Sequence, residues 1–276
     1  MPGAAAVPAD PMQADPMQAD PMWERRHPGG PESWSFDFVA PDASLAGFVG
    51  LTIWSAPRLA WYWAALVGRR RPYLLVRDLE VAAPRAPTSR EIRADGLWAD
   101  VNCETPHDHW SLGLEAFGVS LDDPDEALRA ERGDRTGLGL DLEWEASAGV
   151  AGGEGAYGQP CTVHGEILVG GGGGPVETIA FDGRGWRRHT WGGGVDWFGP
   201  AWRVDGFTDG GAAWTAAAED PAVDPAGVGV LERAPLRLER AGRRAVLERS
   251  LCRFRTPGGD SGLGWSERIV ASTPGQ

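Results

Sequence analysis

The chain consists of short runs of apolar and aromatic residues that alternate with glycine, proline and aspartate from residue 32 onward. In Trp34-Ser35-Phe36-Asp37-Phe38, aromatic side chains occupy every second position, which places all three on one face of an extended strand. A period of two that turn residues break at short intervals is typical of antiparallel sheets. The pattern predicts strands at 34–38, 47–54, 59–67, 73–81, 97–104, 110–120, 138–145, 162–169, 177–188, 201–206, 213–218, 228–236, 243–254 and 264–270.

These are too many strands for one small barrel, and a chain of 276 residues is long enough for two domains. We therefore expect an all-β protein of two antiparallel β-barrel or β-sandwich domains packed together. The glycine-rich stretch at 149–158 predicts the boundary between an N-terminal domain over 31–150 and a C-terminal domain over 157–276. The one helix expected is a short connector at 123–130, where Asp123 precedes a proline and acidic residues come first.

The N-terminal residues differ from the rest in composition. Residues 9–22 read ADPMQADPMQADPM, a five-residue repeat with a proline in every copy. Such a stretch is too polar and too rich in proline to pack or to form a helix, so we expect residues 1–30 to be a disordered low-complexity tail. Repeat slippage in the coding sequence explains the repeat more simply than a binding role does.

Charge and cysteine content argue against several classes of protein. The net charge of −13 would repel phosphate backbones, so nucleic acid is not an expected partner. No apolar run approaches the roughly 18 residues that a membrane span needs, and no integral membrane segment is expected. Cys103, Cys161 and Cys252 form neither a disulfide framework nor a CxxC metal pair. Together with the lack of a secretion signal, this favours a cytoplasmic location.

The densest polar and aromatic cluster lies at 181–192. On a strand, Arg187, His189 and Trp191 share one face. Histidine can donate and accept a proton near neutral pH, and the face of an indole can stabilise a developing cation. The alternative is a structural role, in which a buried His189 is hydrogen-bonded and packed by tryptophan.

The same cluster reads D-G-x-G-x-R-x-H-x-W-G from Asp182 to Gly192. Together with the segments at 32–34, 104–110, 114–117 and 141–144, it resembles the actinobacterial branch of the hydroxyneurosporene synthase and AttH-like family. The resemblance covers nearly all of residues 31–270. It implies two lipocalin-like β-barrel domains and large apolar substrates, because the family includes carotenoid 1,2-hydratases and related fungal cyclases.

In the hydratases, the His-x-Trp pair belongs to the proposed catalytic set, and by resemblance it corresponds to His189 and Trp191. The Tyr and Asp that complete this set have no counterpart here, since their positions fall near Ala216 and Ala218. Protonating an alkene carbon requires a strong acid, so we do not expect carotenoid hydration itself.

We expect the protein to bind a large apolar small molecule, such as a terpenoid, steroid or polyketide, in a barrel cavity. Hydration, isomerisation or cyclisation without a cofactor would then use His189 for proton transfer and Trp191 to stabilise charge, with Asp182 or Arg188 orienting the histidine. The alternative is a non-catalytic carrier. Further residues expected to line the ligand site are Trp186, Trp197, Trp202, His109, Trp110, His164 and Glu166.

Two of these histidines have alternative interpretations. His107 and His109 have the spacing of a metal pair, with Glu104 nearby, but Pro106 interrupts the strand, so a hydrogen-bonded loop is favoured and no metal is expected. His164 and Glu166 share a strand face, where they would form an acid/base pair if that face were internal. If the face is exposed, they are ordinary surface residues.

Overall fold

The computed structural model describes residues 20–27, 29–170, 174–218, 220, 224 and 226–272. Almost all regular structure in this part of the chain is antiparallel β, with three short 3-10 helices, η1 (Pro21–Glu24), η2 (Pro124–Leu128) and η3 (Gly192–Gly194). The prediction of an all-β fold is therefore confirmed. No helix in the described residues is long and apolar enough to cross a membrane.

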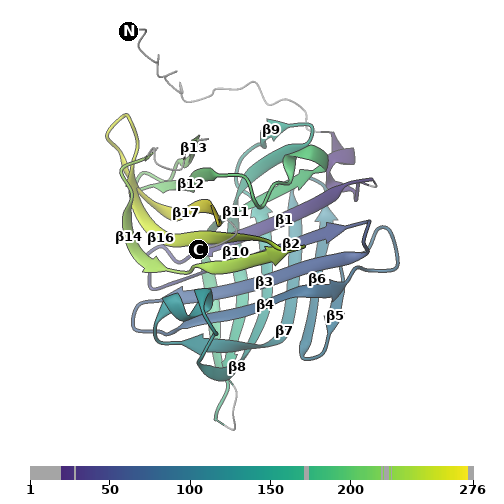
Figure 1. Cartoon of the computed structure of the whole chain (residues 1–276). Coiled ribbons are helices and arrows are strands. Elements are labelled where there is room, and N and C mark those ends of the chain that lie inside the picture. Colours follow the sequence, from purple (N-terminus) through teal and green to yellow (C-terminus); the bar gives the residue numbers. More distant parts are fainter. Residues whose placement is uncertain are drawn as a thin grey trace.

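The first sheet has eleven strands. They are β1 (Pro31–Val39), β2 (Leu45–Trp54), β3 (Leu59–Gly68), β4 (Tyr73–Ala82), β5 (Ile92–Ala94), β6 (Leu97–Thr105), β7 (His109–Leu121), β8 (Asp134–Ala146), β9 (Ala151–Gly153), β10 (Ala156–Gly170) and β11 (Glu177–Trp191). The pairing β1-β2-β3-β4 on one side and β1-β11-β10-β8-β7 on the other closes into a ring where β4 pairs with the end of β7. This ring is a barrel, and β6 and β5 extend from the remaining edge of β7 (Figure 1).

Every second side chain along each barrel strand points inward, and these side chains fill the interior, as is usual for barrels of this size. The largest of these buried side chains are Trp34, Phe36, Phe38, Tyr62, Trp110 and Trp144. Strand alternation therefore places some tryptophans inside the barrel and others outside it. Trp61 and Trp63 flank the inward-facing Tyr62 on β3 and point outward.

The second sheet has six strands, β12 (Ala201–Thr208), β13 (Ala213–Ala218), β14 (Gly229–Arg233), β15 (Leu236–Arg240), β16 (Arg243–Arg255) and β17 (Ser261–Ser272). It lies across the outer face of β1 to β3 (Figure 1). Phe48 and Trp63 from the barrel pack there with Leu247, Leu251 and Trp265 from the second sheet. Within the described residues this sheet is open, with β13 and β14 at its ends.

The chain passes from the first sheet to the second between Trp191 and Ala201, which is later than the predicted boundary at 149–158. This stretch connects β8 to β10, and both strands belong to the barrel. The reason is that β10 and β11 complete the ring by pairing with β8 and β1, so the barrel extends to Trp191 and the second sheet begins at Ala201. The three-residue strands β5 and β9 were not predicted because they are too short to show a period, and β15 was not predicted although Leu236 and Leu238 alternate with polar residues. The expected helix at 123–130 is the single turn η2, which Asp123 caps as predicted.

Residues 20–27, which were expected to belong to a disordered tail, pack against one end of the barrel. Asp20 caps η1 by accepting a hydrogen bond from the Met22 amide, and Trp23 stacks on Tyr157. Glu24 is only 3% exposed. The prediction failed here because these contacts are made with residues far away in the sequence. Residues 1–19, which hold most of the repeat, lie outside the described residues.

Candidate functional site

His189 lies inside the barrel, at the end covered by residues 20–27. On β11 it is opposite Trp34 of β1 and Tyr157 of β10, so the three side chains share the inner face. The imidazole is 1% exposed. It stacks on Trp34 with ring centroids 4.8 Å apart and meets the edge of Tyr157 at 5.8 Å. The interior position expected for His189 is therefore present.

A carboxylate orients the imidazole. His189 Nε2 lies 2.8 Å from Oε1 of Glu32, a fully buried residue of β1. Burial by itself would raise the pKa of Glu32, but hydrogen bonds from His189, Arg26 and the His27 amide outweigh it and lower the pKa. Burial also lowers the pKa of His189, and Glu32 opposes this shift only in part.

The directions of these two pKa shifts indicate the protonation states of Glu32 and His189. Glu32 is an ionised acceptor and His189 is neutral near neutral pH, so the imidazole carries its proton on Nε2 and donates it to Glu32. Nδ1 of His189 is then a bare lone pair. It is buried and has no hydrogen-bond partner among the described residues. The pair therefore presents one free basic nitrogen to the barrel interior.

A second buried ion pair lies next to the first. Arg187 Nη2 is 2.7 Å from Glu24 Oε1, and the hydroxyl of Tyr157 donates to the other oxygen of the same carboxylate. The amide of His107 donates to Glu24 at 2.9 Å. Burial opposes ionisation of Glu24, but the charge of Arg187 prevails and lowers its pKa. Glu24 thus fastens residues 20–27 to three separate parts of the barrel.

Two more of the predicted residues belong to this barrel end. The ring centroids of His189 and Trp191 are 4.9 Å apart, and the half-buried Trp191 stacks on His27 at 4.2 Å. Trp110 is fully buried, and its ring lies under the guanidinium of Arg187 at 5.4 Å.

Asp182 and Arg188 do not orient His189. Asp182 is exposed on the outer face of β11. Arg188 points away from the interior, towards the second sheet, where its Nε lies 2.9 Å from Asp205. Both have the opposite strand parity to His189, so the role expected of them falls to Glu32.

The remaining predicted ligand residues lie outside the barrel. Trp186 donates to the carbonyl of Gly206 in the second sheet, Trp197 donates to Thr52 on the outer face of β2, and Trp202 is a half-buried residue of β12.

The two outward-facing histidines have acidic partners at the surface. His109 contacts Glu143 at 2.6 Å, and His164 contacts Glu145 at 3.6 Å. Glu166 is exposed, so His164 and Glu166 form no internal acid/base pair.

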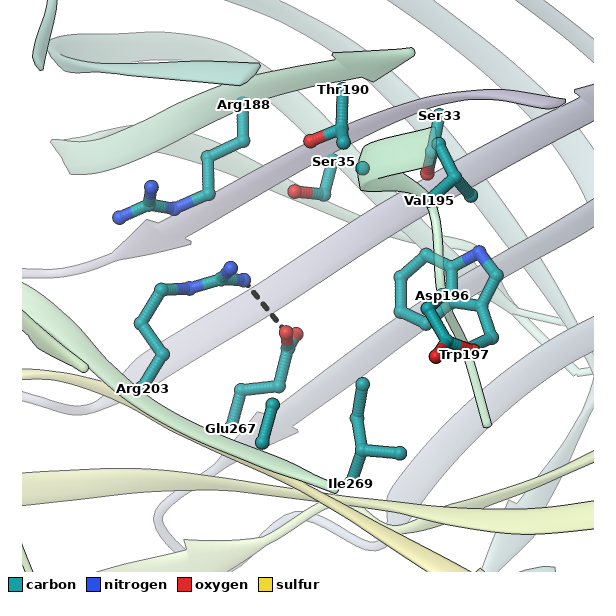
Figure 2. A pocket seen from close by; sticks show the side chains of 12 residues that line it. Ser33, Ser35, Arg188, Thr190, Val195, Asp196, Trp197, Arg203, Glu267 and Ile269 are labelled. Carbon is teal, nitrogen blue, oxygen red and sulfur yellow. Dashed lines mark hydrogen bonds and ion pairs between the residues drawn. The ribbon is translucent and has the colours of Figure 1, made fainter. Parts of the chain in front are cut away.

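A cavity of about 170 Å³ lies between the barrel and the second sheet, on the opposite face of β1 and β11 from His189. Figure 2 shows Ser35 and Thr190 on its barrel wall and the ion pair between Arg203 and Glu267, 2.6 Å long, on the other side. Trp197 forms one end of the cavity. Because the sheet separates this cavity from the imidazole, His189 does not act on its contents.

The residues best placed to hold a metal are His27, Glu32 and His189, whose ligand atoms lie within 4.8 Å of one another. Two imidazoles and one carboxylate are a known ligand set. However, Glu32 already accepts from Arg26, and the positive charge of Arg90 opposes a cation nearby. The charges thus favour a hydrogen-bonded dyad. The other metal candidate does not form, because His107 turns to the Asp20 carbonyl while His109 faces outward.

Five residues at this barrel end were not predicted as site residues, namely Glu24, Glu32, Arg90, Tyr157 and Arg187. For Glu32 a pattern existed, because it precedes Trp34 by two positions and must share its inward face. Arg187 shows the same alternation with His189. Glu24 had no such pattern, since nothing local distinguishes it from an exposed acid.

A family model described as "Domain of unknown function (DUF7064)" matches residues 20–202, more than half of the chain. The match begins at the segment that covers the barrel and ends at the second residue of β12. No curated protein matches the chain in sequence.

A solved structure of a candidate AttH protein from Nitrosomonas europaea is similar with a TM-score of 0.51 and 12% identity, covering 96% of this chain and 98% of the other. This likeness supports the fold. Kievitone hydratase from Nectria haematococca gives a TM-score of 0.46 at 11% identity, covering 88% of this chain and 90% of its own. CghA gives 0.45 at 12% identity, covering 100% and 96%.

Proposed function

The chain belongs to the family of the domain of unknown function DUF7064, and we propose that it binds a mostly apolar small molecule at the covered end of its barrel and exchanges a proton with it through His189. The observation that carries this proposal is the buried His189–Glu32 pair with a free Nδ1. A neutral imidazole held by a carboxylate can remove a proton from a bound molecule and return it elsewhere.

In this mechanism Glu32 keeps the proton of His189 on Nε2, so that Nδ1 accepts the substrate proton. The cation that forms is stabilised by the Glu32 carboxylate at 2.8 Å and by the face of Trp34. Isomerisation suits this mechanism best, because the proton that His189 takes from the substrate is returned to another atom of the same molecule. Hydration and cyclisation also use a returned proton, and we keep them within the proposal.

We infer the apolar character of the ligand from the side chains that pack inside the barrel. Below the polar end, inward positions carry Leu112, Leu114, Leu140, Leu142 and Ile167. A terpenoid, steroid or polyketide would match apolar side chains of this kind. All three cysteines are free, which supports the proposed reducing, cytoplasmic location.

A non-catalytic carrier is the second candidate. Both faces of His189 are in close aromatic surroundings, with Trp34 stacked on one side and the edge of Tyr157 nearby. Such packing also suits a histidine that only stabilises the barrel.

The test compares the wild type with His189→Gln and with His164→Gln, a control at the exposed outer face. Compounds that copurify with each protein are identified by mass spectrometry, and their binding and conversion are then measured. An enzyme requires that His189→Gln keep binding but lose at least about a hundredfold in rate, with His164→Gln unchanged. Equal conversion by all three proteins would contradict the proposal, and binding without any conversion would establish the carrier.

A further inference from the structure

We propose that Arg90 recognises an anionic group, a carboxylate, at one end of the ligand. This inference rests on the ligand site proposed above and names the chemical class of its occupant. Arg90 belongs to the connection between β4 and β5, which together with residues 20–27 covers the end of the barrel.

The main evidence is that Arg90 is buried but has no carboxylate partner in the described residues. Three arginines in the described residues are buried, namely Arg90, Arg187 and Arg249. Arg187 pairs with Glu24, and Arg249 pairs with Asp37 and Glu267. Arg90 has no ion pair within the described residues. Its one hydrogen bond goes to the backbone carbonyl of Glu24, and its Nε has no partner.

The charges around Arg90 leave one positive charge uncompensated. In the cluster of buried and half-buried side chains at this barrel end, three are guanidinium groups, those of Arg26, Arg90 and Arg187, whereas the carboxylates are those of Glu24 and Glu32. Glu24 is used by Arg187 and Glu32 by Arg26. A buried charge without a counterion is unfavourable, which points to a partner that is brought in by binding.

The neighbours of Arg90 define what that partner must offer. Its guanidinium lies over the rings of Trp34 and Trp110, 5.0 Å and 4.9 Å from their centroids. Both indole nitrogens are buried and without an acceptor in the described residues. Indole and guanidinium nitrogens only donate hydrogen bonds, so the missing group is an acceptor. A planar carboxylate fits a guanidinium in two parallel hydrogen bonds.

The position of Arg90 links this recognition to the proposed chemistry. Trp34 lies under Arg90 and also stacks on His189 at 4.8 Å. A carboxylate held by Arg90 would therefore fix one end of the molecule beside the imidazole. The two indole faces favour an apolar body next to the anionic group. The ligand class is thus an apolar organic acid.

Benzoate and benzamide are suitable probes because they have nearly the same shape and differ in charge. Calorimetry of the wild type should show benzoate binding at least about tenfold more tightly than benzamide, since only benzoate matches the charge of Arg90. Arg90→Gln should remove this preference, and Arg90→Lys should retain part of it. The control Arg93→Gln, at an exposed arginine paired with Glu91, should change nothing. Equal affinities in the wild type, binding of neither probe, or a preference that persists in Arg90→Gln would overturn the proposal.

A second measurement does not depend on whether the Arg90 variants fold. In wild-type protein labelled with nitrogen-15 at tryptophan, benzoate should shift the indole N–H signals of Trp34 and Trp110, and benzamide should not. Shifts confined to other tryptophans would contradict the inference. The variant His189→Gln separates this inference from the proposed function. It should keep the preference for benzoate whether or not conversion of a substrate depends on His189, so the two proposals can fail independently.

Discussion

The barrel end and the interface between the sheets both bury several charges, but they differ in how completely those charges are matched. At the interface, Arg188 and Arg203 share Asp205, and Glu267 joins Arg203 to Arg249. Each of these three arginines has a carboxylate partner. At the barrel end, Arg90 has no carboxylate partner, and neither its Nε nor the Nδ1 of His189 has a hydrogen-bond partner among the described residues.

This difference separates a structural network from a functional one. A complete network holds the second sheet against the barrel and needs nothing more. An incomplete network leaves donors and a base inside a protein, where unpaired polar groups are normally rare. We therefore assign assembly of the two sheets to the interface, and the unpaired groups support the ligand chemistry that we propose for the barrel end.

The largest effect should follow from breaking the complete network. Asp205→Ala leaves Arg188 without a carboxylate and removes one partner of Arg203, which should destabilise the fold by about 4 kcal/mol. Urea unfolding measures this loss. A change of less than about 1 kcal/mol would mean that water replaces the carboxylate and that the interface is not a tight network.

The two regions should also respond to pH in opposite directions. Burial raises the pKa of Asp37 at the interface from 3.8 to about 6, although Arg249 opposes the shift. A raised folded-state pKa means that the folded protein holds this proton more strongly, so the stability it gives is lost as the pH rises from 3.8 to about 6. Relative to Asp37→Asn, the wild type should lose roughly 2–3 kcal/mol over this window in urea unfolding. A flat difference would show that Arg249 keeps Asp37 ionised throughout.

At the barrel end, Glu24→Gln should destabilise the protein by about 2 kcal/mol, because Arg187 then lacks a carboxylate. The pKa of Glu24 is lowered, so the advantage of the wild type is complete above 4.5 and disappears as the pH falls through the folded-state pKa. Hydrogen exchange should show faster opening of residues 20–27. Unchanged exchange in this segment would indicate that Trp23 and Asp20 suffice to hold it.

The smallest effect should come from a residue outside both networks. His164→Gln changes a half-exposed side chain whose partner, Glu145, is also exposed. Its unfolding free energy should stay within about 0.5 kcal/mol of the wild type. A larger loss in thermal or urea unfolding would mean that surface ion pairs on the barrel contribute more than about 0.5 kcal/mol to its stability.

The strands could be predicted because their information is local. The period of two in Trp34-Ser35-Phe36 shows directly which face is buried, and the same rule put His189 and Trp191 on one face of their strand. Nothing local indicates that β1 pairs with β11, so the ring closure and the end of the barrel at Trp191 could not be predicted.

The site residues were even harder to predict, because their partners are far away in the sequence. The partners of His189 and Arg187 are Glu32 and Glu24, which lie 157 and 163 positions away. A buried glutamate looks the same in sequence as an exposed one, and only the closed barrel brings each next to its cation. For this reason Asp182 and Arg188, which are neighbours in sequence, were expected to orient an imidazole that Glu32 holds.

We propose that burial keeps His189 neutral while Glu32 holds its proton on Nε2, which leaves a bare Nδ1 inside the barrel. Nitrogen-15 spectroscopy of histidine-labelled protein measures this directly, because protonated and bare ring nitrogens resonate far apart. Near neutral pH we expect a protonated Nε2 and a bare Nδ1 for His189, with this preference lost in Glu32→Gln. A proton on Nδ1, or on both nitrogens, in the wild type would contradict the account.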